Sequence, residues 1–276
     1  MAKSKLLLLL LLLTTSVFAQ KKTTTIHILN ADKADYDERL GKDVQRLIGN
    51  VVMRQDSTYF YSDSAYYNEK TKFFDGFGNV HINVNDSIDI YSKLLKYNGD
   101  TKFAELFHDV VLKDDSTVLN TQYMTYDRVG HLATYPNHGT ITRNDKKLVS
   151  RKGYYRDDIK VAYFRKDVVG TMPDYKIVSD TLVYDTENEM MYFYGPTNMY
   201  NKENTLYGNY GWYNTETELA YLDRRATLKN KEQSLTADTM YYNKKTGYAK
   251  ALNDVIVEDT VNKARIRGEF AELWKD

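Results

Sequence analysis

The chain has 276 residues, with 38 basic and 38 acidic side chains and no cysteine. The absence of cysteine excludes a disulfide scaffold, a zinc–thiolate site, an iron–sulfur cluster and a cysteine nucleophile. A formal net charge of zero argues against a protein that binds nucleic acid through a basic surface. With 42% hydrophobic residues but only 14 Gly and 3 Pro, the composition predicts a folded core rather than long disorder.

The N-terminus has the pattern of an export signal. Lys3 and Lys5 precede the leucine run Leu6–Leu13, and Ala19 supplies a small residue at the expected cleavage point. This apolar run is shorter than the roughly 20 residues that a membrane-spanning helix needs. We therefore predict that residues 1–19 are a cleaved signal peptide and that the mature protein is periplasmic. Because no cysteine follows the signal, a lipoprotein anchor is not expected.

A tyrosine recurs every 29 or 30 residues through most of the chain. The positions are Tyr67, Tyr97, Tyr126, Tyr155, Tyr184, Tyr213 and Tyr242. On the same period, a large apolar residue is followed two positions later by a small one and then by a polar one, as at Phe60, Ser62 and Asp63. A fixed period of this length indicates stacked supersecondary units, each of which contacts mainly its neighbours.

Each repeat has the pattern of two strands. Apolar and polar residues alternate over about ten residues, and the phase changes near the middle, as a β-bulge would cause. Turn-forming clusters such as Asn85–Ser87 and Asn98–Thr101 bound the strands. We predict about 16 antiparallel strands within residues 49–276, built from about eight two-strand repeats of 29 residues, with residues 20–48 as a capping half-repeat. Only Glu38–Leu47 suggests a short helix.

The repeated segments resemble a known family. Gly49–Met53 and Gly78–Ile82, each followed about a dozen residues later by a Ser-Asp or Ser-Lys segment that ends in tyrosine, are similar to the repeats of the OstA-like family. This organic-solvent-tolerance group includes a periplasmic lipopolysaccharide transport protein and the N-terminal domain of its outer-membrane partner. The resemblance extends from about Ile26 to Leu273. Asn137–Gly139, Thr197–Met199 and Arg225–Thr227 depart from the Gly-Asn-Val pattern, which affects the strand register.

The resemblance implies an all-β fold and a function. The fold would be an elongated antiparallel β-jellyroll, shaped like a taco shell and open at its ends. The function would be to shield the acyl chains of lipopolysaccharide in an apolar groove during transport to the outer membrane, in contact with inner- and outer-membrane transport components that carry homologous domains. The residues expected to line the groove are Phe60, Ile90, Leu119, Leu148, Ile177, Leu206, Leu235, Val51, Val80, Val110 and Val168.

Two alternatives follow from the same pattern. Period-two apolar columns more often form a closed core than a ligand site, so the chain would then be a non-catalytic structural repeat protein, such as a stalk or an adhesin-like β-solenoid. The tyrosines would either line the mouth of a groove or, as we favour, pack as an ordinary aromatic ladder.

No pattern of catalysis or metal binding stands out. The histidines, His27, His81, His108, His131 and His138, form no HExxH arrangement, and the chain has no phosphate-binding glycine loop or GxSxG turn. We predict a protein that is not an enzyme and has no cofactor. Strand edges expected near Ile26–Leu29 and Leu273–Asp276 would pair with further copies end to end or with homologous domains.

Overall fold

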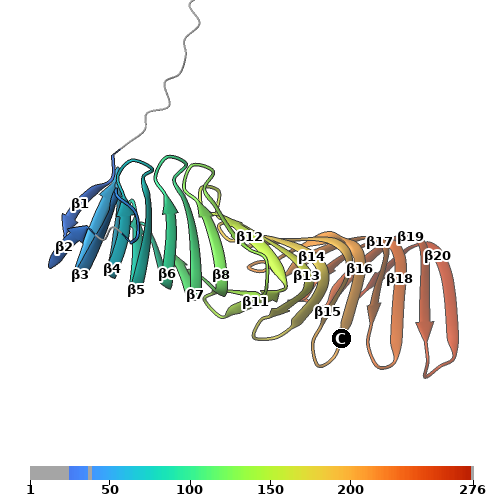
Figure 1. Ribbon diagram of the computed structural model, residues 1–276. Helices are drawn as coiled ribbons and strands as arrows, with labels where there is room; N and C mark the ends of the chain where they lie inside the picture. Colours follow the sequence, from blue (N-terminus) through green and yellow to red (C-terminus); the bar gives the residue numbers. More distant parts are fainter. Residues whose placement is uncertain (1–24, 37–38, 275–276) are drawn as a thin grey trace, which may run out of the picture.

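The computed structural model describes residues 25–36 and 39–274, and the signal peptide expected at residues 1–19 lies outside the described residues. Within the described part, 20 antiparallel strands form one elongated sheet (Figure 1). The strands are β1 (His27–Asn30), β2 (Lys33–Tyr36), β3 (Val44–Gln55), β4 (Thr58–Asn68), β5 (Phe73–Val84), β6 (Ile88–Asn98), β7 (Phe103–Asp114), β8 (Thr117–Asp127), β9 (Leu132–Tyr135), β10 (Gly139–Arg143), β11 (Lys146–Ser150), β12 (Lys152–Arg156), β13 (Val161–Thr171), β14 (Lys176–Asp185), β15 (Met190–Tyr200), β16 (Thr205–Asn214), β17 (Leu219–Lys229), β18 (Gln233–Asn243), β19 (Tyr248–Asp259) and β20 (Ala264–Leu273). The predicted all-β antiparallel fold is confirmed.

Alternate long strands, namely β3, β5, β7, β13, β15, β17 and β19, carry a β-bulge near the middle, and the strands paired with them bend at the same level. In β3, Gly49 and Asn50 lie opposite the single residue Asp63 of β4, and both have a positive φ, of 76° and 46°. Glycine and asparagine adopt this left-handed backbone at low cost, which explains the repeated Gly-Asn pair. The side chain of Asn79, at the next bend, donates to Asp63 at 3.0 Å. The bulge therefore produces the predicted change of phase.

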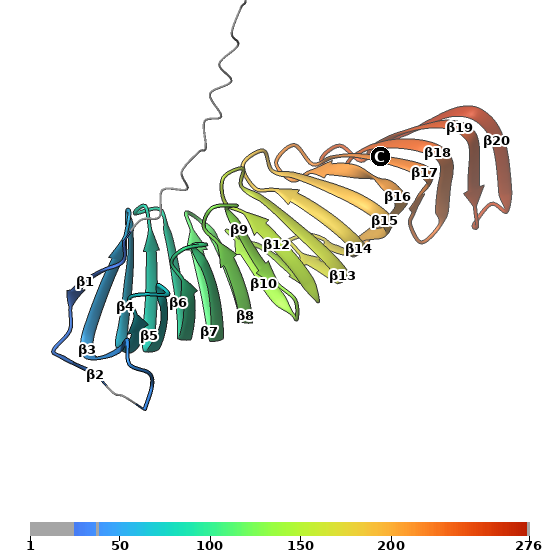
Figure 2. The same cartoon turned by 45° about the horizontal axis from the view of Figure 1, so that its top comes forward.

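The bends fold the sheet lengthwise, so that two half-sheets face each other across one apolar interior (Figure 2). The strands connect through turns on two rims. The first rim consists of turns 56–57, 85–87, 115–116, 144–145, 172–175, 201–204, 230–232 and 260–263. The second rim consists of turns 69–72, 99–102, 128–131, 157–160, 186–189, 215–218 and 244–247. Among the described residues, no helix is long and apolar enough to cross a membrane.

At the predicted irregular repeat, two pairs of short strands each take the place of one long strand, and we call each such position in the sheet a row. β9 and β10 pair with the two halves of β8, and β11 and β12 pair with the two halves of β13. Pro136, between β9 and β10, has no N–H group with which to continue the ladder. When each pair is counted as one row, β3–β20 contribute 16 rows, in agreement with the predicted strand number.

The short helix expected at Glu38–Leu47 is wrong where the chain is described. Val44–Leu47 begin β3, and Leu47 pairs with Ala34 on one side and Ala65 on the other. Leu47 is fully buried, so pairing and packing on both sides override the weak local preference for a helix. Glu38 lies outside the described residues.

The N-terminal strands cover the first row of the sheet. β1 pairs with the second half of β3 and β2 pairs with its first half. Ile26, which precedes β1, is only 4% exposed and packs against Gly99 on the second rim, close to where a glycine Cβ would lie. The expected boundary between residues 48 and 49 falls inside β3, beside its bend, and the division into a capping half-repeat and a repeat domain stays a prediction.

Replacing Gly153 by alanine should destabilise the protein by about 1–3 kcal/mol, because the new methyl group overpacks the irregular repeat. A Cβ at Gly153 would lie 2.6 Å from the Tyr163 carbonyl oxygen and 2.3 Å from the Tyr135 hydroxyl. Urea unfolding measures the loss. Gly76→Ala is the matched control, since its Cβ would meet nothing closer than 3.5 Å. Equal stabilities of the two variants would contradict this packing.

Candidate functional site

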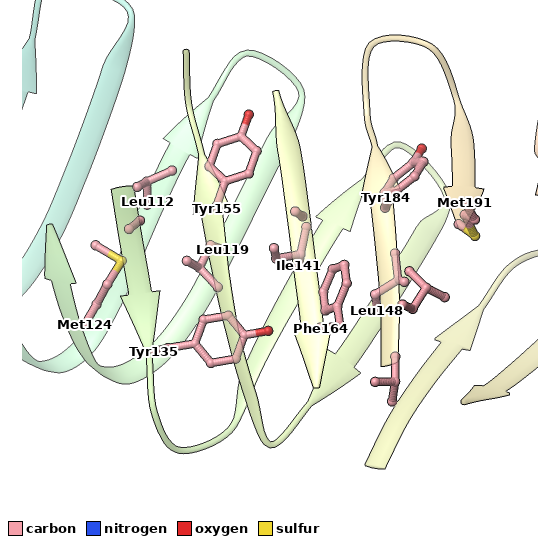
Figure 3. Packing of buried hydrophobic residues seen from close by; sticks show 14 of the residues in the cluster. Leu112, Leu119, Met124, Tyr135, Ile141, Leu148, Tyr155, Phe164, Tyr184 and Met191 are labelled. Atoms are coloured by element: carbon pink, nitrogen blue, oxygen red, sulfur yellow. The ribbon is translucent and has the colours of Figure 1, made fainter. Parts of the chain in front are cut away.

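The apolar interior contains every residue that was expected to line a groove. All of the predicted positions in both columns are between 0% and 4% exposed. The register brings them into the same layer, for example Phe60 of β4 opposite Met53 and Ile82. Further aliphatic and aromatic side chains fill the space between the columns, including Ile141 and Phe164 (Figure 3). The interior of this structure is therefore packed with its own side chains at these positions.

The small residues of the repeat form the bends rather than widening the interior. The hydroxyl of Ser92 donates to the carbonyl oxygen of Leu94 at 3.2 Å. The same bond, from a hydroxyl to the carbonyl two residues ahead, recurs at Thr121, Ser150 and Ser179. Because a short hydroxyl side chain can reach a backbone carbonyl two residues ahead, serine and threonine suit this position.

The repeated tyrosines bury their rings in the interior and direct their hydroxyls toward the rims, as Tyr155 and Tyr184 do in Figure 3. The hydroxyl partners are Gln55 for Tyr97, Asp157 for Tyr126, Asp114 for Tyr155 and Glu189 for Tyr184, at 2.5, 2.5, 2.8 and 2.6 Å. Burial raises the pKa of Tyr97 to about 12. Burial and the facing carboxylates raise the pKa of Tyr126 and Tyr184 further. The tyrosines thus join the core to the polar contacts between the rims.

Contacts between the two rims, which we call the seam, begin beside the first rows. Asp56 on the first rim forms an ion pair with Lys102 on the second, at 2.7 Å. Gln55 donates to the carbonyl oxygen of Gly99 at 2.8 Å. Arg128 adds a hydrogen bond to the Gln55 side chain at 3.2 Å. These groups close the mouth of the folded sheet at its N-terminal end.

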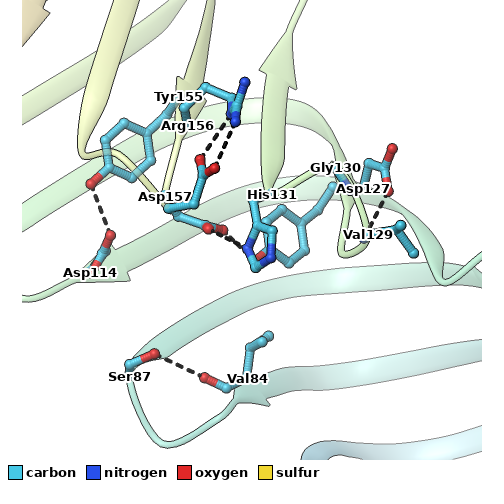
Figure 4. Close-up of polar contacts among 12 residues, drawn as sticks. Val84, Ser87, Asp114, Asp127, Val129, Gly130, His131, Tyr155, Arg156 and Asp157 are labelled. Carbon is cyan, nitrogen blue, oxygen red and sulfur yellow. Dashed lines mark hydrogen bonds and ion pairs between the residues drawn. The ribbon is translucent and has the colours of Figure 1, made fainter.

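The seam continues through the middle of the molecule. Asp114, at the end of β7, is only 3% exposed and accepts hydrogen bonds from the Tyr155 hydroxyl at 2.8 Å and from Lys160 at 2.6 Å; the bond from Tyr155 is drawn in Figure 4. One repeat further on, Glu189 lies 3.2 Å from Lys146 and 3.6 Å from Arg143. Hydrogen bonds to buried charges are among the stronger polar contacts in proteins.

The seam ends where the turn between β13 and β14 meets the turn between β18 and β19. Lys244 on the second rim lies 3.5 Å from Asp174 on the first rim and 2.6 Å from Glu218. Beyond this point the rims enclose a cavity of about 370 Å³. Its lining combines apolar side chains with polar groups: Glu203, Asn204, Leu228, Asn230, Glu232, Gln233, Ser234, Leu235, Tyr242, Gly247, Val257, Leu273 and Trp274. Leu235, predicted for the groove, lines this cavity, and Leu206, also predicted, lines a smaller recess beside it.

The histidines take structural positions. His131 lies 2.8 Å from the buried carboxylate of Asp157, which also accepts from Tyr126 (Figure 4). His81 lies 2.6 Å from Asp89. His108 and His138 adopt left-handed backbone conformations at bends. Within residues 25–36 and 39–274, no group of three His, Asp or Glu side chains is arranged to hold a metal ion.

Sequence reasoning missed the seam. Its residues lie in turns, which the repeat pattern identified only as points of reversal. One signal was present: Asp56 and Lys102 are 46 residues apart, and so are Asp114 and Lys160. This recurring spacing of an acid and a base could have indicated paired rims, but only with the pitch of the stacked rows already known.

Two of the comparisons with known proteins gave matches. A model of the OstA-like protein family matches residues 23–180 and 177–238. No curated protein matches. A solved structure, LptH from Pseudomonas aeruginosa, described as the LptA-homologous periplasmic component of a lipopolysaccharide transport device, is 16% identical with a TM-score of 0.33, over 48% of this chain and 95% of that one.

The buried tyrosines predict a loss of stability in alkali. Because burial raises their pKa above the usual value near 10, the folded state holds protons that the unfolded state releases. Stability should be complete below pH 10 and fall between pH 10 and about 12, by about 1.4 kcal/mol per pH unit for each such tyrosine. Urea unfolding at several pH values measures this slope.

Tyr97→Phe should reduce the loss of stability between pH 10 and about 12 by the contribution of one tyrosine, about 1.4 kcal/mol per pH unit. At pH 8 the comparison with the unaltered protein isolates the loss of packing and hydrogen bonding, so the pH dependence is separable from it. A slope unchanged by the substitution would contradict the assignment.

Proposed function

The chain belongs to the OstA-like family, and from this membership we propose that it shields the acyl chains of lipopolysaccharide in its interior during transport to the outer membrane. The observation that carries the proposal is the continuous apolar layer between the half-sheets, from Val51 in β3 to Leu235 in β18. Such a layer gives acyl chains a water-free path along the molecule.

Acyl chains can occupy this layer only if the half-sheets separate. Leu148 and Ile177 are fully buried, and the rims above the interior are joined by the seam. Burying a dozen methylenes gains up to roughly 10 kcal/mol, at about 0.8 kcal/mol each, before ordering costs. A seam contact stabilises the closed form by about 1–3 kcal/mol. Lipid uptake is therefore strong enough to offset the opening of several contacts.

The proposal includes the cellular setting. The protein is exported by cleavage of residues 1–19, works in the periplasm without catalysis or a cofactor, and divides into the capping half-repeat 20–48 and the repeat domain 49–276. Its end strands pair with further copies or with homologous domains of inner- and outer-membrane transport components. Support for this pairing comes from β20, whose register pairing among the described residues is with β19 alone and which exposes Ile266 by 65% and Phe270 by 53%.

A second candidate function has its own observation. The interior positions are as buried as those of an ordinary core, and the seam closes the mouth, so a structural repeat protein with a closed core also fits. The two functions differ in whether the seam opens. A stalk would keep its rims joined under all conditions, whereas a lipid carrier must part them.

Bridging the seam chemically should block lipid uptake. Because the chain contains no cysteine, the double variant Asp56→Cys/Lys102→Cys has two unique thiols, which a bifunctional thiol reagent can join across the rims. Binding of purified lipopolysaccharide is then measured with and without bridging. The unbridged protein should bind and the bridged protein should lose most of its binding, because the half-sheets can no longer part.

The matched control bridges two turns of the same rim. Lys72 and Asp100 form an ion pair at 2.8 Å within the second rim, so Lys72→Cys/Asp100→Cys reacts with the same reagent but leaves the mouth free to open. This control should keep its binding after bridging. Failure of every form to bind lipopolysaccharide would favour the closed structural core. Binding that persists in the bridged seam would contradict opening of the rims.

A further inference from the structure

The C-terminal end of the interior contains a cavity, whereas the positions of the predicted groove nearer the N-terminus are packed with side chains. Leu228, Leu235 and Val257 form an apolar side, which Leu273 and Trp274 of the last row extend. The cavity volume of about 370 Å³ lies within the range of small-molecule sites, which is about 300–1,000 Å³. The space suits one apolar chain and is too small for several.

A small recess opens beside this cavity and shares Asn204 and Tyr242 with it. The recess has a volume of about 30 Å³, close to that of one water molecule or a single polar group. Its walls include Tyr175 and Tyr213, whose rings meet edge to face with centroids 5.0 Å apart. The recess therefore has room for one polar atom at the inner end of the cavity.

The two tyrosine hydroxyls at this recess are buried and interact with each other, and no other hydrogen-bond partner is found for them among the described residues. Because only one of them can donate to the other, the Tyr213 hydroxyl is left as a donor without an acceptor. Tyr213 is only 1% exposed. Burial raises the pKa of both tyrosines, so both hydroxyls stay protonated and remain donors. A buried donor without an acceptor is costly, and proteins rarely retain one that no ligand or water satisfies. The missing element is an acceptor oxygen.

The mouth of the cavity, formed by turns 201–204 and 230–232 of the first rim, is polar and charged. Glu203 and Glu232 lie there with the amides of Asn230 and Gln233, and Lys202 and Lys231 lie beside the two carboxylates. Equal numbers of acidic and basic side chains suit a head group that is neutral or carries both charges. The cavity thus presents a mouth with charges of both signs, an apolar wall and a buried hydroxyl donor.

We propose that this cavity binds a lipid with a single ester- or amide-linked acyl chain and a neutral or zwitterionic head group. The carbonyl oxygen accepts a hydrogen bond from the Tyr213 hydroxyl, the chain lies along Leu228, Leu235 and Val257, and the head group faces the charged mouth. This site goes beyond the proposed function, because it does not require a multi-chain lipid or opening of the seam.

A pair of matched probes tests the role of the carbonyl. The first is lauroyl-lysophosphatidylcholine and the second is the dodecyl ether analogue, which lacks the carbonyl. Binding is measured below micelle formation through the fluorescence of Trp274, in a Trp212→Phe background that leaves it the only tryptophan. The ester should bind about tenfold more tightly than the ether, as expected for a hydrogen bond to an unpaired donor.

Variants of the site should change binding in different ways. Tyr213→Phe should reduce the preference for the ester severalfold while binding of the ether changes little. Val257→Phe should strongly weaken binding of both probes by occupying part of the cavity, whereas Val178→Phe, on the exposed face of β14, should have no effect. Circular dichroism confirms folding of each variant, and Tyr213→Phe, which only removes an oxygen, keeps the test valid if the larger substitution disrupts the fold.

The outcomes separate this site from the proposed function. Equal binding of ester and ether, or ester binding unchanged by Val257→Phe, would overturn the site. The protein bridged at Asp56→Cys/Lys102→Cys should still bind the lysolipid, because the cavity lies beyond the end of the seam. Lysolipid binding without lipopolysaccharide binding would support this site and contradict the proposed function, and the reverse result would do the opposite.

Discussion

The structure depends on the bend that each long strand makes near its middle. One extra residue per bend, held in left-handed conformations at pairs such as Gly49-Asn50 and His108-Asp109, turns a flat antiparallel meander into two facing half-sheets. The bends align because hydroxyl and amide side chains satisfy the backbone there, as Ser92 and Asn209 do for the carbonyl oxygens of Leu94 and Arg224. Without the bends, the apolar columns would face water, and there would be neither a core nor a seam.

Much of the fold could be predicted because the 29-residue period repeats the same local chemistry. The tyrosines, the large apolar column and the bulges each lie where the repeat places them. The helix expected before Leu47 failed because pairing with β2 and β4 is invisible in the local pattern. The split rows β9–β12 occur around Asn137–Gly139, where the motif departs from the Gly-Asn-Val pattern and where we expected a change in strand register.

The candidate site was predictable only in part. The interior residues were identified, since alternation marks a buried face whether that face is filled or hollow. Alternation does not reveal how far apart the half-sheets lie, so a packed interior and an open track looked alike. The seam depends on side chains such as Asp114 and Lys160, which come together only through the pitch and twist of the stacked rows.

The two ends of the interior have different properties. Ile26 and the Asp56–Lys102 ion pair close the N-terminal end, whereas the rims beyond Lys244 enclose a cavity. The closed part is stabilised by buried tyrosines whose hydroxyls bind seam residues, so opening the mouth changes the surroundings of the core directly. This coupling makes the state of the seam the central question for function.

The most direct measurement is photo-crosslinking in the native cell envelope. A photoreactive residue is placed at buried Leu148 or Ile177, with exposed Arg151 at a bend as the control. The account predicts lipopolysaccharide adducts at the two interior positions and none at Arg151. Absence of adducts at both interior positions, in protein that is folded and abundant, would contradict it and leave a closed structural core.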